Sequence, residues 1–143
     1  MSSSATRQSA QEPVMQTFAT PAPVTAVVAV PAGRIRLAAA DRDTTTVEVR
    51  PADPNKRRDV KLAAQVTAAY ADGVLRVTAP AGHRVLGSFG AVEVTVQLPA
   101  GSAVQAKAAS TQFTTEGPLG DVTFDSAQAT VNVEQAATAR LAT

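Results

Sequence analysis

An alternating stretch at residues 91–98, AVEVTVQL, constrains the fold of this chain more than any other feature of its sequence. The apolar and polar side chains fall on opposite parities: Val92, Val94, Val96 and Leu98 against Glu93, Thr95 and Gln97. Because successive side chains of a β-strand point to opposite sides, the stretch predicts a strand with one buried and one exposed face. Its β-branched residues favour the same structure.

Further stretches between residues 24 and 79 also have the character of strands. They are 24–30 (VTAVVAV), 34–37 (RIRL), 46–50 (TVEVR) and 74–79 (VLRVTA). Residues 60–70 (VKLAAQVTAAY) follow the turn-rich segment 51–59 and fit either a short helix or a strand face. The sequence therefore predicts an all-β fold made of short strands.

The tripeptide Pro-Ala-Gly follows a valine-rich run three times, at residues 31–33, 80–82 and 99–101. Proline at the second position of a type I turn fixes φ, and glycine at the fourth position lets the chain leave freely. Proline also has no N–H to donate to a sheet ladder, so each copy is expected to end its strand. We interpret the three copies as strand terminators and not as binding loops.

The sequence beyond the third copy repeats itself weakly at a fixed shift. The shift aligns Val104 with Val122, Ala106 with Phe124, Phe113 with Val131, Thr115 with Val133 and Glu116 with Glu134. A period of about 18 residues suits one coil in a stack of short strands joined by tight corners. We predict a β-solenoid or β-helix-like stack, and keep a β-sandwich made from a meander as the alternative.

Four segments together resemble the putative-adhesin β-strand-repeat family of bacteria, a domain of unknown function. They are VAVPAGRIRLAAADRDTTTVEVRP, ADGVLRVTAP, AVEVTVQLPAGSAVQAKAAS and GPLGDVTFDSAQATVNVE, and the resemblance covers about residues 17–143. The family's order is a G-x-v-x-v strand, a dG-L-x-v strand, an l-P-a-g strand and then short repeats with g-D-v. The resemblance implies β-rungs and, through the family name, adhesion, and it implies that this chain corresponds to the N-terminal portion.

The chain departs from the family pattern at two repeat corners. Ser110-Thr111-Gln112 and Ser126-Ala127-Gln128 stand where the family favours Ser-Gly-Asp. Glycine reaches positive φ without strain, and other residues do not. We therefore expect wider or bulged corners at these two places.

Length and composition along the chain suggest one domain with a tail. Residues 1–20 are rich in Ser, Gln and Thr and are predicted to be a disordered N-terminal tail, with either Met1 or Met15 as the start. Residues 21–143 form the predicted β-strand-repeat domain. Because residues 134–143 contain no closing turn or polar cap, we expect a chain truncated at its C-terminal end, or missing coils supplied by a partner.

Charge and residue usage exclude several classes of protein. With 13 basic and 12 acidic residues, the chain has no strong field to recruit nucleic acid or an anionic membrane. The absence of cysteine excludes disulfides, thiolate metal sites and cysteine nucleophiles. We expect a cytoplasmic location, because the sequence contains neither a signal peptide nor an apolar run of about 18 residues.

The single histidine, His83, lies in the glycine-flanked segment PAGHRVLGSFG together with Ser88. A general base beside a serine nucleophile is one interpretation. The spacing of the glycines around Ser88 does not fit the G-x-S-x-G nucleophile elbow, and no helix is expected after it. A solvated or turn-bonded histidine is favoured.

Acidic and basic clusters are also interpreted as structural. Asp41 and Asp43, like Asp121 and Asp125, lack the third acidic ligand and the glycine of calcium loops, so turn capping is favoured. The basic run 55–59 (NKRRD) has no aromatic neighbour and is predicted to be a solvated turn. The sequence thus predicts no catalytic, cofactor-binding or metal-ligating residue.

Threonines on strands are the remaining candidates for a binding surface. They are Thr44, Thr45, Thr46, Thr95, Thr111, Thr114, Thr115, Thr123 and Thr130. Threonine commonly fills outward positions of strands, which accounts for these residues without a ligand. We favour this interpretation over binding faces lined with hydroxyl groups.

The sequence therefore favours a non-catalytic structural or interaction module, which binds protein or a second copy through β faces or an exposed strand edge. An envelope-associated or regulatory scaffold is the alternative. A carbohydrate-active β-helix enzyme is the least favoured class, because only Asp121 and Asp125 share a parity as paired acids.

Overall fold

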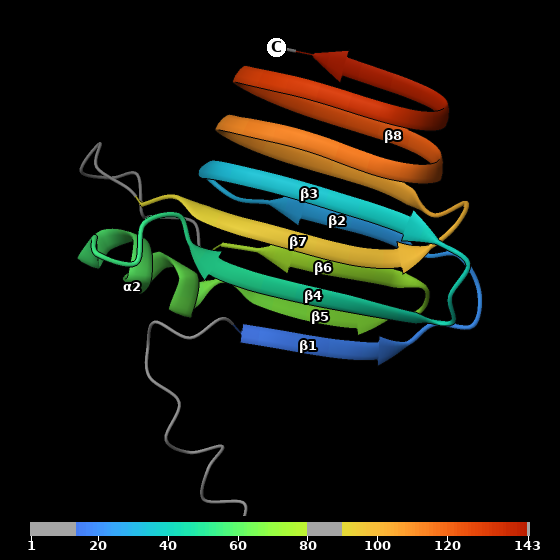
Figure 1. The fold of residues 1–143 in the computed structure, drawn as a ribbon, viewed down its shortest axis with the longest axis horizontal. Coiled ribbons are helices and arrows are strands. Elements are labelled where there is room, and N and C mark those ends of the chain that lie inside the picture. Colours follow the sequence, from blue (N-terminus) through green and yellow to red (C-terminus); the bar gives the residue numbers. More distant parts are fainter. Residues whose placement is uncertain (1–13, 80–89, 143) are drawn as a thin grey trace, which may run out of the picture.

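The computed structural model describes residues 14–79 and 90–142, and in these ranges the chain is all-β with a single helix (Figure 1). The elements are β1 Val14–Ala19, β2 Thr25–Ala29, β3 Ala32–Ala40, β4 Thr44–Pro51, α2 Arg57–Gln65, β5 Thr67–Ala71, β6 Val74–Thr78, β7 Val92–Pro99 and β8 Ala103–Ala142. The predicted all-β class is confirmed. In these ranges no helix has the length and apolar character needed to cross a membrane.

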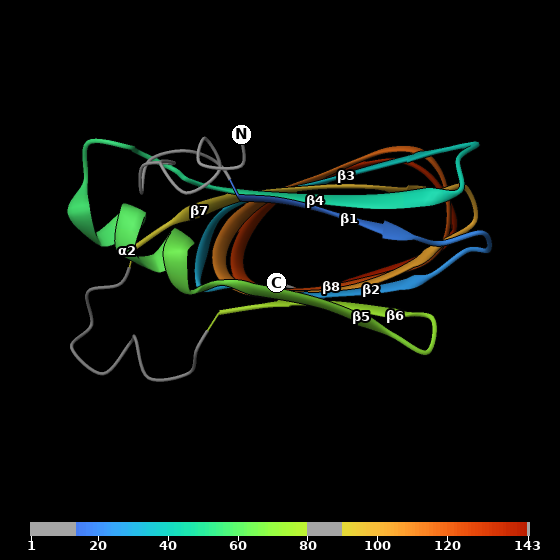
Figure 2. The same cartoon turned by 90° about the horizontal axis from the view of Figure 1, so that it is seen from below.

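The strands form one sheet that is folded into two layers (Figure 2). The strand order is β1-β4-β7-β3-β8-β2-β6-β5, and β8 pairs with both β3 and β2. We call β1, β4, β7 and β3 the first layer and β5, β6 and β2 the second layer; β8 runs through both. Only β5 and β6 are neighbours in both sequence and space. The alternative of a sandwich made from a meander is therefore wrong.

The register ties β2 and β3 to the beginning of β8. Ala26 pairs with Val104 in one layer and Ile35 pairs with Phe113 in the other, both in parallel. The two residues of each pair are 78 positions apart in the sequence. The Thr111 hydroxyl and the Gly33 carbonyl, which form a hydrogen bond, are also 78 residues apart. β2 and β3 thus form one pass through both layers, and the first part of β8 lies on it as the next pass.

Later passes of β8 continue the same stack, as the orange and red ribbons show (Figure 1). The Gly120 N–H donates to the Ser102 carbonyl at 2.8 Å. The Ser126 hydroxyl donates to the Ala109 carbonyl, which lies 17 residues earlier in the chain. These bonds join neighbouring passes and hold each on the one before it.

Small and β-branched side chains fill the space between the layers. In β7, Val92, Val94, Val96 and Leu98 are each at most 1% exposed. The strand predicted from the alternation of residues 91–98 is therefore confirmed, with its polar residues outward. Two aromatic rings, Phe113 and Phe124 of successive passes of β8, stack with centroids 4.4 Å apart.

The ambiguous segment 60–70 divides between two elements. Its first part lies in α2, whose Leu62 and Ala63 are buried at 1% and 5% exposure. Its second part forms β5, which turns into β6 through Asp72 and Gly73 with φ of 53° and 78°. Positive φ at both central residues suits a tight hairpin turn.

Strand β1 corrects the prediction of a disordered tail over residues 1–20. β1 pairs antiparallel with β4 over its whole length, so Val14–Ala19 belong to the sheet. The pairing satisfies the open edge of β4, and Phe18 contacts Tyr70 of β5 with ring centroids 5.9 Å apart. Such long-range contacts are not visible in local composition. Residues 1–13 lie outside the described ranges.

The Pro-Ala-Gly copies at 31–33 and 99–101 follow or end their strands, as predicted. The turn at the second of these sites differs from the expected type. The Ser102 N–H donates to the Pro99 carbonyl, so Pro99 is the first residue of the turn and not the second. Gly101 then occupies the third position with φ of 86°, as a type II turn requires. The copy at 80–82 lies outside the described residues.

The corners that lack glycine are neither turns nor left-handed. Residues 110–112 and 126–128 remain in the extended conformation of β8. Apart from glycines, Asp72 is the only residue in the described ranges with positive φ. Thr111 and Ser126 turn inward instead, where their hydroxyls bond carbonyls of the preceding pass.

Candidate functional site

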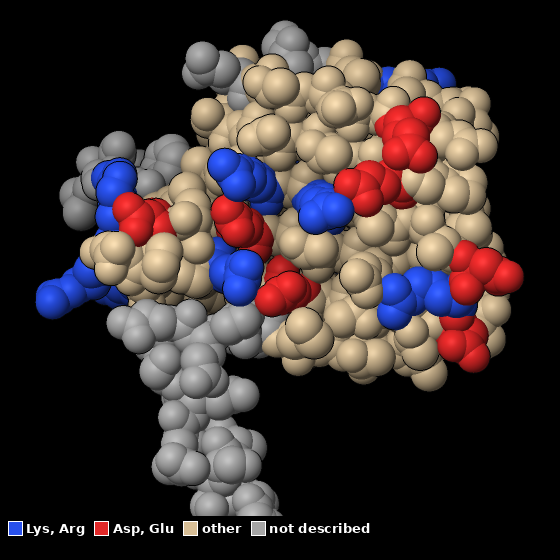
Figure 3. All heavy atoms as spheres, in the orientation of Figure 1, with Lys and Arg blue, Asp and Glu red and all other residues tan. Residues whose placement is uncertain are grey.

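The outward side chains of the first layer form a flat polar face, which we call the outer face (Figure 3). It consists of Thr46, Glu48 and Arg50 of β4, Glu93, Thr95 and Gln97 of β7, Arg34 and Arg36 of β3, and Gln112, Thr114 and Glu116 of β8. Basic and acidic groups alternate across it (Figure 3). The face is a consequence of strand parity, since each of these residues lies between two inward ones.

Ion pairs neutralise most of the charge on the outer face. Arg34 Nη1 lies 3.3 Å from Glu93 Oε2, and Arg36 Nη2 lies 2.9 Å from Glu116 Oε2. These arginine side chains remain 66% and 55% exposed. Exposed pairs of this kind contribute only about 0–1 kcal/mol to stability. The arginines can therefore exchange or share their partners at little cost.

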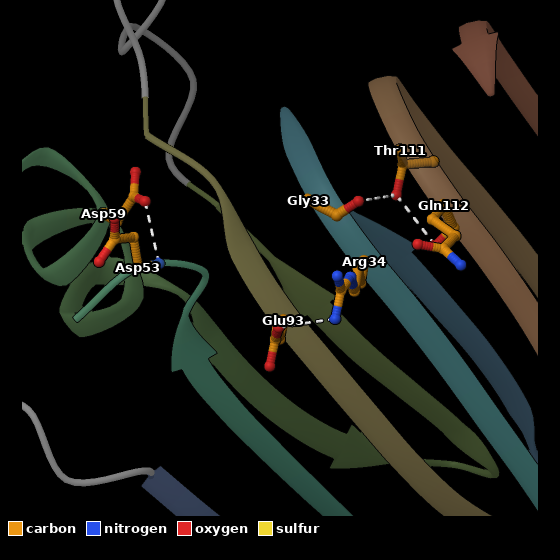
Figure 4. Close-up of polar contacts among 7 residues, drawn as sticks. All are labelled: Gly33, Arg34, Asp53, Asp59, Glu93, Thr111 and Gln112. Carbon is orange, nitrogen blue, oxygen red and sulfur yellow. Dashed lines mark hydrogen bonds and ion pairs between the residues drawn. The ribbon is translucent and has the colours of Figure 1, made fainter. Parts of the chain in front are cut away.

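A shallow hollow of about 300 Å³ lies on the outer face between β3 and the first pass of β8. Arg34, Ile35 and Arg36 line one side, and Gln112 and Thr114 line the other. The parallel register places Arg34 beside Gln112 and Arg36 beside Thr114. Figure 4 shows Arg34 and Gln112 on these neighbouring strands. The volume lies at the lower end of the range for small-molecule sites.

Several residues singled out from the sequence do not form a site. His83 and Ser88 lie outside the described residues. Asp41 and Asp43 are exposed in the connection from β3 to β4, where the Asp43 carbonyl accepts the Thr20 N–H at 2.9 Å. In the ranges 14–79 and 90–142, no three acidic or histidine side chains are grouped so that they could hold a metal ion.

The acidic pair Asp121 and Asp125 is exposed on β8, on the outer side of the stack. Asp121 Oδ1 accepts a hydrogen bond of 2.6 Å from the Thr138 hydroxyl. Asp121 thus joins two passes of β8, a role that differs from the predicted turn cap. The two aspartates share a face, as their parity suggested.

The basic run 55–59 begins helix α2, so the predicted solvated turn is wrong from Arg57 onward. Asp59 is only 4% exposed. Its carboxylate accepts the Asp53 N–H at 3.1 Å and the Ala91 N–H at 2.9 Å, which ties the helix to the end of β4 and the start of β7. Figure 4 shows the Asp53 contact. A carboxylate in the first helical turn also suits the helix dipole.

The strand threonines divide into outward and inward groups. The outward ones are Thr44, Thr46, Thr95, Thr114, Thr123 and Thr130, and the buried ones are Thr45, Thr111 and Thr115. Thr45 shares a hydrogen bond of 2.8 Å with Thr20. The Thr115 hydroxyl has no partner among the described residues. The outward group fits the favoured interpretation of threonine at solvent-facing positions.

Sequence reasoning missed the pair Arg34 and Arg36 as candidates. Their alternation with Ile35 and Leu37 did place both outward. Their neighbours Gln112 and Thr114 lie 78 residues later in the chain, at the separation set by the same register. Local pattern gives no signal for a contact at that distance in sequence.

Each end of the stack carries apolar side chains that are only partly buried. At one end, Phe18 and Tyr70 contact each other across the two layers. At the other end lies the last pass of β8, residues 129–142. Its apolar Val131, Val133 and Ala136 are only partly buried, and Leu141 is 48% exposed. Figure 1 shows no described strand beyond this pass.

No family model and no curated protein matches the chain. Solved structures do show similarity. A putative cell adhesion protein from Clostridium sporogenes ATCC 15579 has 10% identity and a TM-score of 0.48, with 92% of this chain and 99% of that chain covered. A putative adhesin from Parabacteroides merdae ATCC 43184 has 12% identity and a TM-score of 0.45, with 85% and 52% covered. A putative adhesin from Bacteroides fragilis NCTC 9343 has 8% identity and a TM-score of 0.41, with 93% and 98% covered.

Chemically, the described residues offer two kinds of contact. The outer face offers arginine, amide and hydroxyl groups around the hollow between β3 and β8. The last pass of β8 offers a strand edge with partly exposed apolar side chains behind it.

Proposed function

We propose that this chain is a non-catalytic interaction module built as a β-solenoid, and that the last pass of β8 binds a β-strand of a partner. The partner strand adds to the edge of residues 129–142 by β-augmentation. Backbone N–H and C=O groups of that edge supply the hydrogen bonds, and the apolar side chains behind it supply the buried area.

The regular spacing of the passes supports the solenoid. β2 and β3 both lie 78 residues from their β8 partners, so they form a coil of the same geometry as the first coil of β8. Within β8, the Ser126–Ala109 and Thr138–Asp121 hydrogen bonds each span 17 residues. Coils of nearly constant length are what a solenoid requires.

Insertion of one coil tests the solenoid. Duplicating the segment 104–121 directly after Asp121 adds one repeat of even length, which keeps the parity of every later side chain. This variant should unfold cooperatively, and its m value in denaturant should be larger than that of the unmodified chain, because the m value scales with the surface exposed on unfolding. A control insert that is one alanine longer turns Val122 and Phe124 outward and should be strongly destabilised. Equal stability of the two inserts would contradict the proposal.

The loss of burial from one pass of β8 to the next is the observation that carries the binding proposal. Val131 and Val133 of the last pass are only partly buried. The positions one repeat before these valines, Phe113 and Thr115, are 0% and 1% exposed because a further pass covers them. A strand added beyond residues 129–142 would cover Val131 and Val133 in the same way.

A charge placed behind the edge tests the binding site. Val133→Lys puts an ammonium group among the inward side chains, and Asn132→Lys puts the same charge on the outer side of the same strand. Light scattering of the purified chain over a range of concentrations reports self-association, and pull-down from the native cell reports another protein. We expect Val133→Lys to abolish the interaction and Asn132→Lys to retain it, with circular dichroism showing both folded. An interaction lost equally in both variants, or in neither, would place the binding site elsewhere.

A further inference from the structure

We propose that the hollow between β3 and the first pass of β8 binds an anionic group carried on a sugar, with Arg34 and Arg36 as its anchors. The ligand class is an acidic polysaccharide whose carboxylate or sulfate group enters the hollow. This inference goes beyond the strand-edge interaction proposed above, because it uses the outer face and does not involve the last pass of β8.

The geometry of the hollow suits a single small anion. Residues two apart on a strand are separated by roughly 6.6 Å, and neighbouring strands by roughly 4.8 Å. Arg34 and Arg36 therefore form one long side of a small rectangle, and Gln112 and Thr114 form the other. The Arg34 guanidinium faces Glu93 of β7, away from β8 (Figure 4), and the Arg36 guanidinium faces Glu116 of β8. An anion in the hollow would draw both groups toward Gln112 and Thr114.

Both arginines retain hydrogen-bond donors for a ligand. A guanidinium group has five N–H donors in a planar fork that matches carboxylate and sulfate oxygens. Each of the two arginines makes one ion-pair contact, Arg34 with Glu93 and Arg36 with Glu116. Arg34 pairs toward β7 and Arg36 toward β8, and neither pair uses all the donors of its guanidinium group.

The surroundings of the hollow offer polar groups that suit a sugar attached to the anionic group. Its five lining residues include no aromatic ring on which a neutral sugar could stack. Hydroxyl and amide groups of Thr95, Gln97 and Thr114 continue across the outer face and can bond sugar hydroxyls.

Isothermal titration of the full chain with defined probes tests the proposal. The probes are oligogalacturonate for carboxylated sugars, a heparin oligosaccharide for sulfated sugars, and neutral dextran oligomers. Vesicles that contain phosphatidylserine test a membrane. We expect one or both acidic oligosaccharides to bind, and Arg34→Ala/Arg36→Ala to weaken that binding at least about tenfold. The acidic probe that binds identifies the group as carboxylate or sulfate.

A matched pair on the second layer controls for net charge. Arg76→Ala/Lys107→Ala removes two exposed positive charges from β6 and β8, on the opposite outer side, and should change affinity less than about twofold. Arg34→Lys/Arg36→Lys keeps the charge but loses the planar fork, and should still weaken binding several-fold. All variants change exposed side chains, and circular dichroism verifies that they are folded.

Several results would overturn the inference. With the unmodified chain, these are no binding of either acidic oligosaccharide, binding of dextran with equal affinity, or vesicle binding that depends on Arg34 and Arg36. With the variants, they are an equal loss of affinity in Arg76→Ala/Lys107→Ala, or an unchanged affinity in Arg34→Lys/Arg36→Lys. None of these measurements depends on the edge of residues 129–142. If no acidic oligosaccharide binds, the proposed strand-edge interaction is unaffected. If the strand-edge interaction is disproved, the proposed anion site is unaffected.

Discussion

The stacked rings of Phe113 and Phe124 should contribute more to stability than any other pair of side chains in β8. Both are fully buried, at 0% exposure, and their planes differ by only 9°. Phe124→Ala removes a buried ring and leaves a cavity between the layers, which costs about 3–5 kcal/mol. For a domain of this size, that loss lowers the thermal midpoint by roughly 10 °C. Val131→Ala, at a partly buried position in the next pass, should cost about 1 kcal/mol.

A double-mutant cycle separates the ring contact from the burial. Urea unfolding followed by circular dichroism gives the free energy of unfolding for Phe113→Ala, Phe124→Ala and the double variant. The double variant should lose about 0.5–1.5 kcal/mol less than the sum of the single losses, because the stacking contact can be lost only once. Fully additive losses, or a loss below about 1 kcal/mol for Phe124→Ala, would refute the packing of these two passes against each other.

Four further substitutions, of which Gly73→Ala is a control, are tested by the same unfolding measurement. Gly33→Ala should lower the free energy of unfolding by about 3 kcal/mol or more, because the added Cβ would lie 1.8 Å from the Val92 carbonyl oxygen of β7 and the φ of residue 33 is 125°. Gly73→Ala should lower it by only about 1–2 kcal/mol, because no atom lies within 4 Å of the added Cβ. Asp59→Asn should cost about 1–3 kcal/mol, because a neutral amide accepts the two backbone N–H groups less well, and a neutral result would remove the role of Asp59 in docking α2. Thr115→Val should raise stability by about 1 kcal/mol, because it removes a buried hydroxyl that has no partner among the described residues; a loss of stability would mean that the hydroxyl is satisfied.

Local alternation was sufficient to predict most individual strands. In β7, parity alone separated four buried apolar residues from Glu93, Thr95 and Gln97, and the structure confirms each of these orientations. The same reasoning placed Arg34 and Arg36 outward on β3. It failed to choose between helix and strand at residues 60–70, where α2 depends on the docking of Asp59 against two backbone N–H groups that lie outside the segment.

Strand order could not be predicted from the same information. Period-two alternation fixes which side chains share a face but does not identify the neighbouring strand. β3 lies between β7 and β8, and both of its partners come much later in the chain, as the pairs Ile35–Val94 and Ile35–Phe113 show. A meander was therefore as compatible with the strands as the observed order. The hollow on the outer face depends on the pairing of β3 with β8, so it could not be predicted from the sequence either.

The placement of β2 and β3 explains how the parallel strands are arranged in the described residues. Because these strands have the same geometry as a coil of β8, each of their long edges is covered, by β6 and β7 on one side and by β8 on the other. Beyond β6 and β7, antiparallel β4, β5 and β1 end the parallel series, and the Phe18–Tyr70 contact joins the layers there. Our strand-edge proposal places a further parallel strand next to residues 129–142, the last pass of β8 in the described residues.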